Sequence, residues 1–202
     1  ARSLKNFLCK INIDGKGSPS YICATEFWNY FFLREDMKIL QLDIEGFRSL
    51  KSVSWKPGDL NVLIGPNGTG KSNLLRFLKL MSISAQGGLG KYIQSLGGME
   101  PIVWDGQATS ISFKVKTSPV EENRDPQRDA LTYALELSRL GSGSSYRIQR
   151  ELLANYYHVE LGKKAEPFKF LERNGLRASI FDEKRHTLTA PEESVLEEES
   201  IL

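Results

Sequence analysis

One eight-residue segment of the 202-residue chain combines glycines, a lysine and a serine at a spacing suited to holding phosphate. The segment is Gly65-Pro66-Asn67-Gly68-Thr69-Gly70-Lys71-Ser72. Glycine, four residues, glycine, lysine and serine follow in the order of a phosphate-binding loop. Glycine lets successive backbone N–H groups turn toward an anion and approach it closely. A helix starting at the lysine adds unpaired N–H groups and the positive end of its dipole. The pattern predicts a triphosphate site.

The side chains of this loop have separate predicted roles. Lys71 is expected to reach the β- and γ-phosphates, which makes it the candidate catalytic residue. The hydroxyl of Ser72 is expected to ligate Mg²⁺, with phosphates and waters completing the octahedron. Asn67 is placed for a further γ-phosphate contact. ATP and Mg²⁺ are therefore the predicted ligands, and the alternative is a glycine-rich turn that binds nothing.

Short strands and one helix are expected to position the loop. Residues 38–45 alternate apolar and polar side chains, which predicts a half-buried strand, and a second strand follows a turn at Gly46 near residues 51–55. The apolar run 60–64, bounded by turn signals, predicts a buried central strand directly before the loop. A helix is expected over residues 71–82, with one apolar face formed by Leu74, Leu75, Leu78 and Met81.

The later part of the chain has a different pattern. Residues 84–108 are glycine-rich and predict loops with a short helix near 89–96. Residues 109–181 predict an antiparallel meander of about five strands, with Asn174-Gly175 as a strong hairpin signal. Arg173, Arg177, Lys184 and Arg185 are a candidate basic patch beside that hairpin. The end of the chain is acidic and is expected to be solvated, including the adjacent Glu192 and Glu193.

Composition sets limits on function. Hydrophobic residues make up 40% of the chain, charged residues 26%, and the net charge is +2, so there is no general basic footprint for nucleic acid. No apolar run approaches the ~20 residues of a membrane helix, and we expect a soluble cytoplasmic protein. Cys9 and Cys23 are expected to be free thiols. His158 and His186 are isolated and are expected at the surface.

Two segments together resemble a known family. Residues 37–50, ending in Gly46-Phe47-Arg48-Ser49-Leu50, and residues 63–75, ending in Lys71-Ser72-Asn73-Leu74-Leu75, resemble the start of a RecF/SMC-type ATPase. Within that group the chain is most similar to predicted AAA-family ATPases with an ABC-type head, relatives of the overcoming-lysogenization-defect nucleases. Residues 97–106 also resemble this subgroup. The resemblance implies that Arg48 contacts bound nucleotide, and it extends the candidate site to Asn73.

The resemblance implies an α/β fold: a P-loop NTPase head of ABC type, in its N-terminal part, with a mixed sheet around the P-loop and an attached antiparallel β subdomain. On this basis residues 37–108 are the ATP-binding core, residues 109–181 the β subdomain, and residues 182–202 an acidic tail. Residues 1–36 are expected to be an extension upstream of a natural start at Met37. Heads of this family dimerise head to head around two ATP molecules and commonly couple ATP to work on DNA, in repair or phage defence.

The chain also departs from the family pattern. It has no LSxGE-like signature, no apolar strand ending in Asp-Glu and no switch histidine after such a strand. We therefore expect the front part of a head, which binds nucleotide better than it hydrolyses it. DNA stays a candidate partner. The alternatives are an ABC transporter nucleotide-binding subunit and a non-catalytic, ATP-dependent interaction module.

Overall fold

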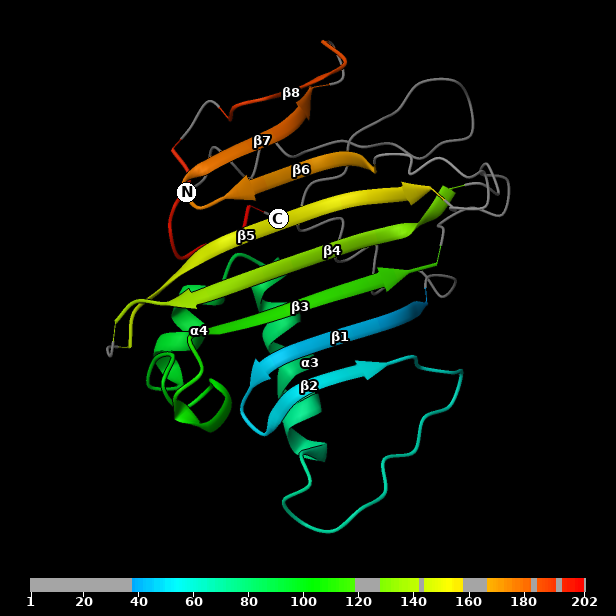
Figure 1. The fold of residues 1–202 in the computed structure, drawn as a ribbon, viewed down its shortest axis with the longest axis vertical. Coiled ribbons are helices and arrows are strands. Elements are labelled where there is room, and N and C mark those ends of the chain that lie inside the picture. Colours follow the sequence, from blue (N-terminus) through cyan, green and yellow to red (C-terminus); the bar gives the residue numbers. More distant parts are fainter. Residues whose placement is uncertain are drawn as a thin grey trace.

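An antiparallel sheet forms the frame of the protein (Figure 1). The computed structural model describes residues 38–118, 128–141, 144–157, 167–182, 185–191 and 194–201. Within these residues the sheet has eight strands in the order β2-β1-β3-β4-β5-β6-β7-β8, and every neighbouring pair is antiparallel. The strands are β1 (Ile39–Phe47), β2 (Leu50–Trp55), β3 (Ser110–Thr117), β4 (Arg128–Arg139), β5 (Tyr146–Tyr157), β6 (Phe168–Asn174), β7 (Arg177–Asp182) and β8 (Thr187–Thr189).

Several predictions from the sequence lie outside the described residues. They concern the extension 1–36 with its two cysteines, the start at Met37, and four side chains of the later part, His158, Lys184, Glu192 and Glu193. His186 lies within the described part and is exposed, as predicted.

Two helices lie against one face of the sheet, α3 (Lys71–Ala85) and the shorter α4 (Leu89–Ser95) (Figure 1). A 3₁₀ turn, η1 (Trp104–Gly106), leads into β3. Phe77 of α3 packs edge-to-face between Phe47 and Phe113, with ring centroids 5.3 Å apart in both pairs. Phe113 in turn packs against Tyr133 at 5.7 Å. This row of rings crosses β1, β3 and β4 and fixes α3 on the sheet, because such pairs add ~0.5–1.5 kcal/mol beyond the apolar area they bury.

The helix is confirmed, but its buried face is not the predicted one. Leu74 and Met81 are buried as expected, whereas Leu75 is 63% exposed. Phe77 and Leu80 complete the buried stripe in its place. Residues i, i+3 and i+7 share a helix face, and Leu75 is turned about 100° from Leu74.

The predicted buried strand at residues 60–64 is wrong. The run forms no strand, and its apolar side chains are exposed, Leu60 by 85% and Ile64 by 90%. An apolar run becomes a buried strand only where neighbouring strands pair with its backbone, and no described strand pairs with this one. For the same reason the expected mixed sheet is not found. The sheet in the described residues is wholly antiparallel, and residues 60–64 add no strand to it.

The five-strand meander over residues 109–181 is confirmed as β3 to β7. The hairpin signal is also confirmed, since Asn174 pairs with Arg177 across the β6–β7 turn and Gly175 has a φ of 59°. The meander continues the same sheet as β1, because β1 pairs with β3 from Ile39 to Glu45. The first turn differs slightly from expectation. β1 continues through Gly46 to Phe47, and the chain reverses at Arg48 and Ser49.

The acidic end of the chain is not simply solvated. Arg173, predicted in a surface basic patch, is fully buried. Its guanidinium donates to the backbone carbonyls of Leu196 at 2.6 Å and Glu199 at 2.7 Å. It also lies 3.8 Å from the buried carboxylate of Glu151. The segment 196–201, called the C-terminal segment below, is therefore held against the sheet by hydrogen bonds to a buried ion pair of the sheet.

Candidate phosphate-binding site

The site begins at the N-terminus of α3. Gly70 occupies the N-cap position with a φ of 96°. Within the described part of the chain, no side chain caps this end and the first turn has no acidic residue. The N–H groups of Asn73 and Leu74 donate to the Gly70 carbonyl at 2.9 and 3.0 Å. The earlier N–H groups of the first turn have no partner within the helix, and they carry the positive end of its dipole. This end suits an anion.

Two loop glycines adopt conformations that other residues avoid. Gly68 and Gly70 have φ values of 86° and 96°. A Cβ on Gly70 would lie 2.9 Å from Ser49 Oγ, whereas a Cβ on Gly68 would meet nothing within 4 Å. Gly70 is therefore required both by its torsion and by the close approach of the β1–β2 turn, and Gly68 by its torsion alone.

Lys71 lies within the loop. Its ammonium donates to the carbonyl oxygens of Gly65 and Pro66, at 2.6 Å each, and lies 3.3 Å from Thr69 Oγ1. The Thr69 hydroxyl donates to the Pro66 carbonyl at 3.0 Å. An ammonium has three donors and no acceptor. Because the three nearby oxygens all belong to the loop, the positive charge of Lys71 lies on the inner side of the loop. All of these contacts are exposed, and none anchors the sheet or its core.

The other predicted loop residues are at the surface. Asn67 and Ser72 are exposed, as are Gly65, Pro66, Gly68 and Thr69. Ser72 is the second residue of α3, directly after Lys71. The two side chains with proposed ligand roles therefore follow each other at the open end of one helix.

Asn73 points away from the loop. Its side-chain amide donates to Ser49 Oγ at 2.9 Å, and its amide oxygen accepts from Arg76 at 3.2 Å. Ser49 was not among the predicted site residues, although it lies in the motif that carried the family resemblance. Its contacts with Gly70 and Asn73 join the β1–β2 turn to the first turn of α3.

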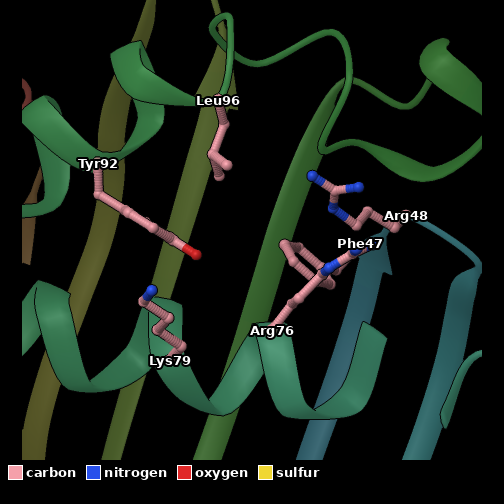
Figure 2. Close-up of a pocket in the computed structure, with 6 residues that line it drawn as sticks. All are labelled: Phe47, Arg48, Arg76, Lys79, Tyr92 and Leu96. Carbon is pink, nitrogen blue, oxygen red and sulfur yellow. The ribbon is translucent and has the colours of Figure 1, made fainter. Parts of the chain in front are cut away.

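Arg48 lies in a pocket that contains no loop residue. It has a φ of 48°, and its N–H donates to the Ile102 carbonyl at 2.8 Å. Its side chain lines a pocket of about 270 Å³ between the β1–β2 turn, α3 and α4 (Figure 2). The pocket is lined by Phe47, Arg48, Arg76, Lys79, Tyr92 and Leu96. Of the residues predicted to hold nucleotide, the structure thus gathers 65–72 at one place and sets Arg48 apart.

A family comparison bears on this site. Residues 60–200 match the family model described as "AAA domain, putative AbiEii toxin, Type IV TA system". The matched span covers more than two thirds of the chain and includes the whole loop. The chain belongs to this family. The AAA domain is therefore a P-loop nucleotide-binding domain of an AAA-family ATPase, a class that generally uses ATP and Mg²⁺. No curated protein matches the chain.

The residues at the loop fit Mg·ATP. The uncapped N-terminus of α3 and the Lys71 ammonium supply positive charge for phosphates. Ser72 supplies a hydroxyl oxygen, a ligand that Mg²⁺ binds. In the described part of this AAA domain, no helix is long and apolar enough to cross a membrane.

Proposed function

We propose that this AAA domain binds Mg·ATP through Gly65–Ser72 and serves as the nucleotide-binding part of a RecF/SMC-type ATPase with an ABC-type head. The observation that carries the proposal is the position of Lys71. Its ammonium lies inside the glycine loop at an uncapped helix N-terminus, bonded to exposed loop carbonyls. A lysine with a structural role would instead be expected to pair with a carboxylate or to cover the core.

Each group of the loop has a part in binding. The N–H groups of residues 68–72 are proposed to bind the phosphate oxygens, and Lys71 to exchange its carbonyl contacts for the β- and γ-phosphates. Asn67 is proposed to contact the γ-phosphate, and Ser72 to hold Mg²⁺. When bound, Mg²⁺ neutralises charge that develops on the phosphates. Asn73 is better assigned to positioning, because its side chain joins α3 to Ser49.

The proposal also covers ATP hydrolysis and the process to which hydrolysis is coupled. By family resemblance, two heads close on two ATP molecules, and the cycle is coupled to DNA repair or phage defence. Phosphoryl transfer needs a group that positions the attacking water and a cation that stabilises the transition state. Neither is assigned within residues 38–201. We therefore expect the 202-residue chain to bind Mg·ATP and to turn it over very slowly.

Lys71→Ala tests the binding site. Loss of charge-assisted bonds worth ~1.5–3 kcal/mol is expected to weaken Mg·ATP binding by roughly 10- to 100-fold. Stability should change by less than about 0.5 kcal/mol, because the Lys71 contacts are exposed. Isothermal titration calorimetry and urea unfolding measure the two effects. Lys56→Ala, an exposed lysine before the loop, is the matched control. Equal ATP affinity in the Lys71 and Lys56 variants would refute the loop assignment.

A turnover assay separates the proposal from its alternatives. Stimulation of ATP hydrolysis by DNA in the complete protein supports the RecF/SMC-type function. Nucleotide binding without turnover in the complete protein supports the interaction module. Turnover that depends on a membrane partner and not on DNA supports the transporter subunit.

A further inference from the structure

A second cluster of positive charge lies beside the phosphate loop and is separate from it. The pocket between the β1–β2 turn, α3 and α4 contains the cationic groups of Arg48, Arg76 and Lys79 (Figure 2). Arg76 and Lys79 come from successive turns of α3, and Arg48 comes from the turn opposite them. Six side chains line the pocket, and none of them is acidic or belongs to residues 65–72.

These three cations have no anionic partner in the described part of the protein. None of them lies within ion-pair distance of a carboxylate there. Arg76 donates one bond, to the neutral amide oxygen of Asn73, and Lys79 lies 5.9 Å from the centre of the Tyr92 ring. Gathering three like charges around one hollow is unfavourable unless something of opposite charge compensates them.

Arg48 has a hydrogen-bond donor at the pocket that the described part of the protein leaves without a partner. Its Nε is buried and meets no hydrogen-bond acceptor among the described residues. A buried donor left without a partner costs about 1–3 kcal/mol. The backbone of Arg48 is held in the left-handed region by the bond to Ile102, and its guanidinium lies 5.9 Å from the centre of the Phe47 ring. The backbone of Arg48 is therefore fixed in place, and its side chain brings an Nε–H donor without a partner to the pocket.

The chemistry of the lining selects the ligand. Planar guanidinium groups and an ammonium match the oxygens of a phosphate better than any neutral group. The Phe47 and Tyr92 rings and the Leu96 side chain add an apolar wall beside the cations. About 270 Å³ accommodates a phosphate together with part of the molecule that carries it. We propose that this pocket binds the phosphate group of a phosphate ester, at a site distinct from the ATP loop.

The phosphate has two sources to distinguish, a small phosphorylated molecule and the backbone of nucleic acid. The proposal does not depend on the ATP site, so it is tested in the Lys71→Ala background, where the loop is weakened. The pocket variant is Arg76→Ala with Lys79→Ala, two exposed residues of α3. The control is Lys56→Ala with Arg147→Ala, which removes the same charge from exposed positions elsewhere. Circular dichroism confirms that each variant is folded.

Two probes are titrated, inorganic pyrophosphate by calorimetry and a short fluorescein-labelled DNA duplex by anisotropy. The pocket variant is expected to bind at least one probe about tenfold or more weakly than the control variant. Weakened pyrophosphate binding alone indicates that the phosphate belongs to a small molecule. Weakened DNA binding, with a salt slope reduced by about 2, identifies a nucleic-acid backbone.

Two results overturn the proposal. One is equal affinity of the pocket and control variants for both probes. The other is a pair of observations. In the protein that keeps Lys71, the pocket variant loses affinity for Mg·ATP, and in the Lys71→Ala background neither probe binds. The pocket would then be an extension of the ATP site. Failure of Lys71→Ala to weaken Mg·ATP binding refutes the loop assignment instead, so the two failures remain distinguishable.

Discussion

Residues 56–70 leave the sheet after β2 and rejoin the fold at α3, whereas the C-terminal segment lies along β5 and β6 (Figure 1). The first region is rich in apolar side chains that remain exposed, such as Ile64. The second is rich in glutamate, yet buried groups of the sheet hold its backbone. Apolar character alone therefore does not fix a segment to this sheet. Matched hydrogen-bond donors and acceptors do.

The contrast is clearest in the bonds that each region makes. Glu151 accepts from the hydroxyls of Tyr133 and Ser200 and from the N–H of Ile201. The carbonyl of Glu197 accepts from the N–H of Ile148 at 2.8 Å. In residues 56–70 the bonds are exposed and mostly local, as between Gly58 and Asn61, and an exposed ion pair joins Asp59 to Lys38 directly before β1. Because these bonds involve no buried group of the sheet, the loop can rearrange around a ligand without breaking the sheet.

The largest effect is expected from the buried ion pair. Arg173→Ala leaves Glu151 buried without a cation and removes the guanidinium donor from the backbone carbonyls of Gly175, Leu196 and Glu199. The free energy of unfolding should fall by about 3–5 kcal/mol. Urea unfolding measures the loss, and hydrogen exchange should show that the Ile201 amide loses its protection. Arg177→Ala, an exposed arginine on β7, is the matched control and should change stability by less than about 0.5 kcal/mol.

A double variant tests whether charge is the cause. Arg173→Met with Glu151→Leu removes both ions, so no buried charge is left uncompensated, and part of the lost stability should return. If Arg173→Ala were no more destabilising than Arg177→Ala, the C-terminal segment would not be held by this pair, and the contrast with the loop would fail.

The next effect compares one substitution in both regions. Ile201 is partly buried against the core, whereas Ile64 is 90% exposed. Ile201→Ser should therefore destabilise the fold by about 1–2 kcal/mol, because apolar area is lost from the core. Ile64→Ser should change stability by less than about 0.5 kcal/mol. Thermal unfolding of the two variants side by side measures the difference. A larger loss at Ile64 would mean that residues 60–64 are buried in solution.

The sequence predicted those features of the structure that depend on residues close together in the chain. The strands of the meander were predictable because alternation of side chains, as in Ile111, Phe113 and Val115, records directly which face is buried. The loop and the start of α3 were predictable because glycine torsions and an uncapped helix end are local properties. These features depend on few residues, all close together in the chain.

The errors concern partners that are distant in the chain. Residues 60–64 have the composition of a central strand, but pairing depends on another strand and not on composition. Arg173 looks like a surface charge unless its partner Glu151, on the neighbouring strand, is known to face it. Arg48 follows the family pattern in sequence, and its pocket is formed with α4, which comes some forty residues later.

The smallest effect is expected at Glu199, where the C-terminal segment meets α4. Burial raises the pKa of this carboxyl group, and the N–H groups of Gly90 and Leu89 offset the shift in part. The folded protein then keeps the proton at pH values where the unfolded chain has released it. Its free energy of unfolding accordingly decreases as pH rises through that interval.

Glu199→Gln removes this titration while keeping an oxygen that can accept from Gly90. The stability of the variant relative to the unsubstituted chain should therefore improve as pH rises from ~4 to ~7. Urea unfolding at several pH values measures the trend, with the exposed Glu197→Gln as control. A difference that does not change with pH would mean that the Glu199 carboxylate is well solvated. The C-terminal segment would then be held through Arg173 and Glu151, with no contribution from the burial of the Glu199 carboxyl group.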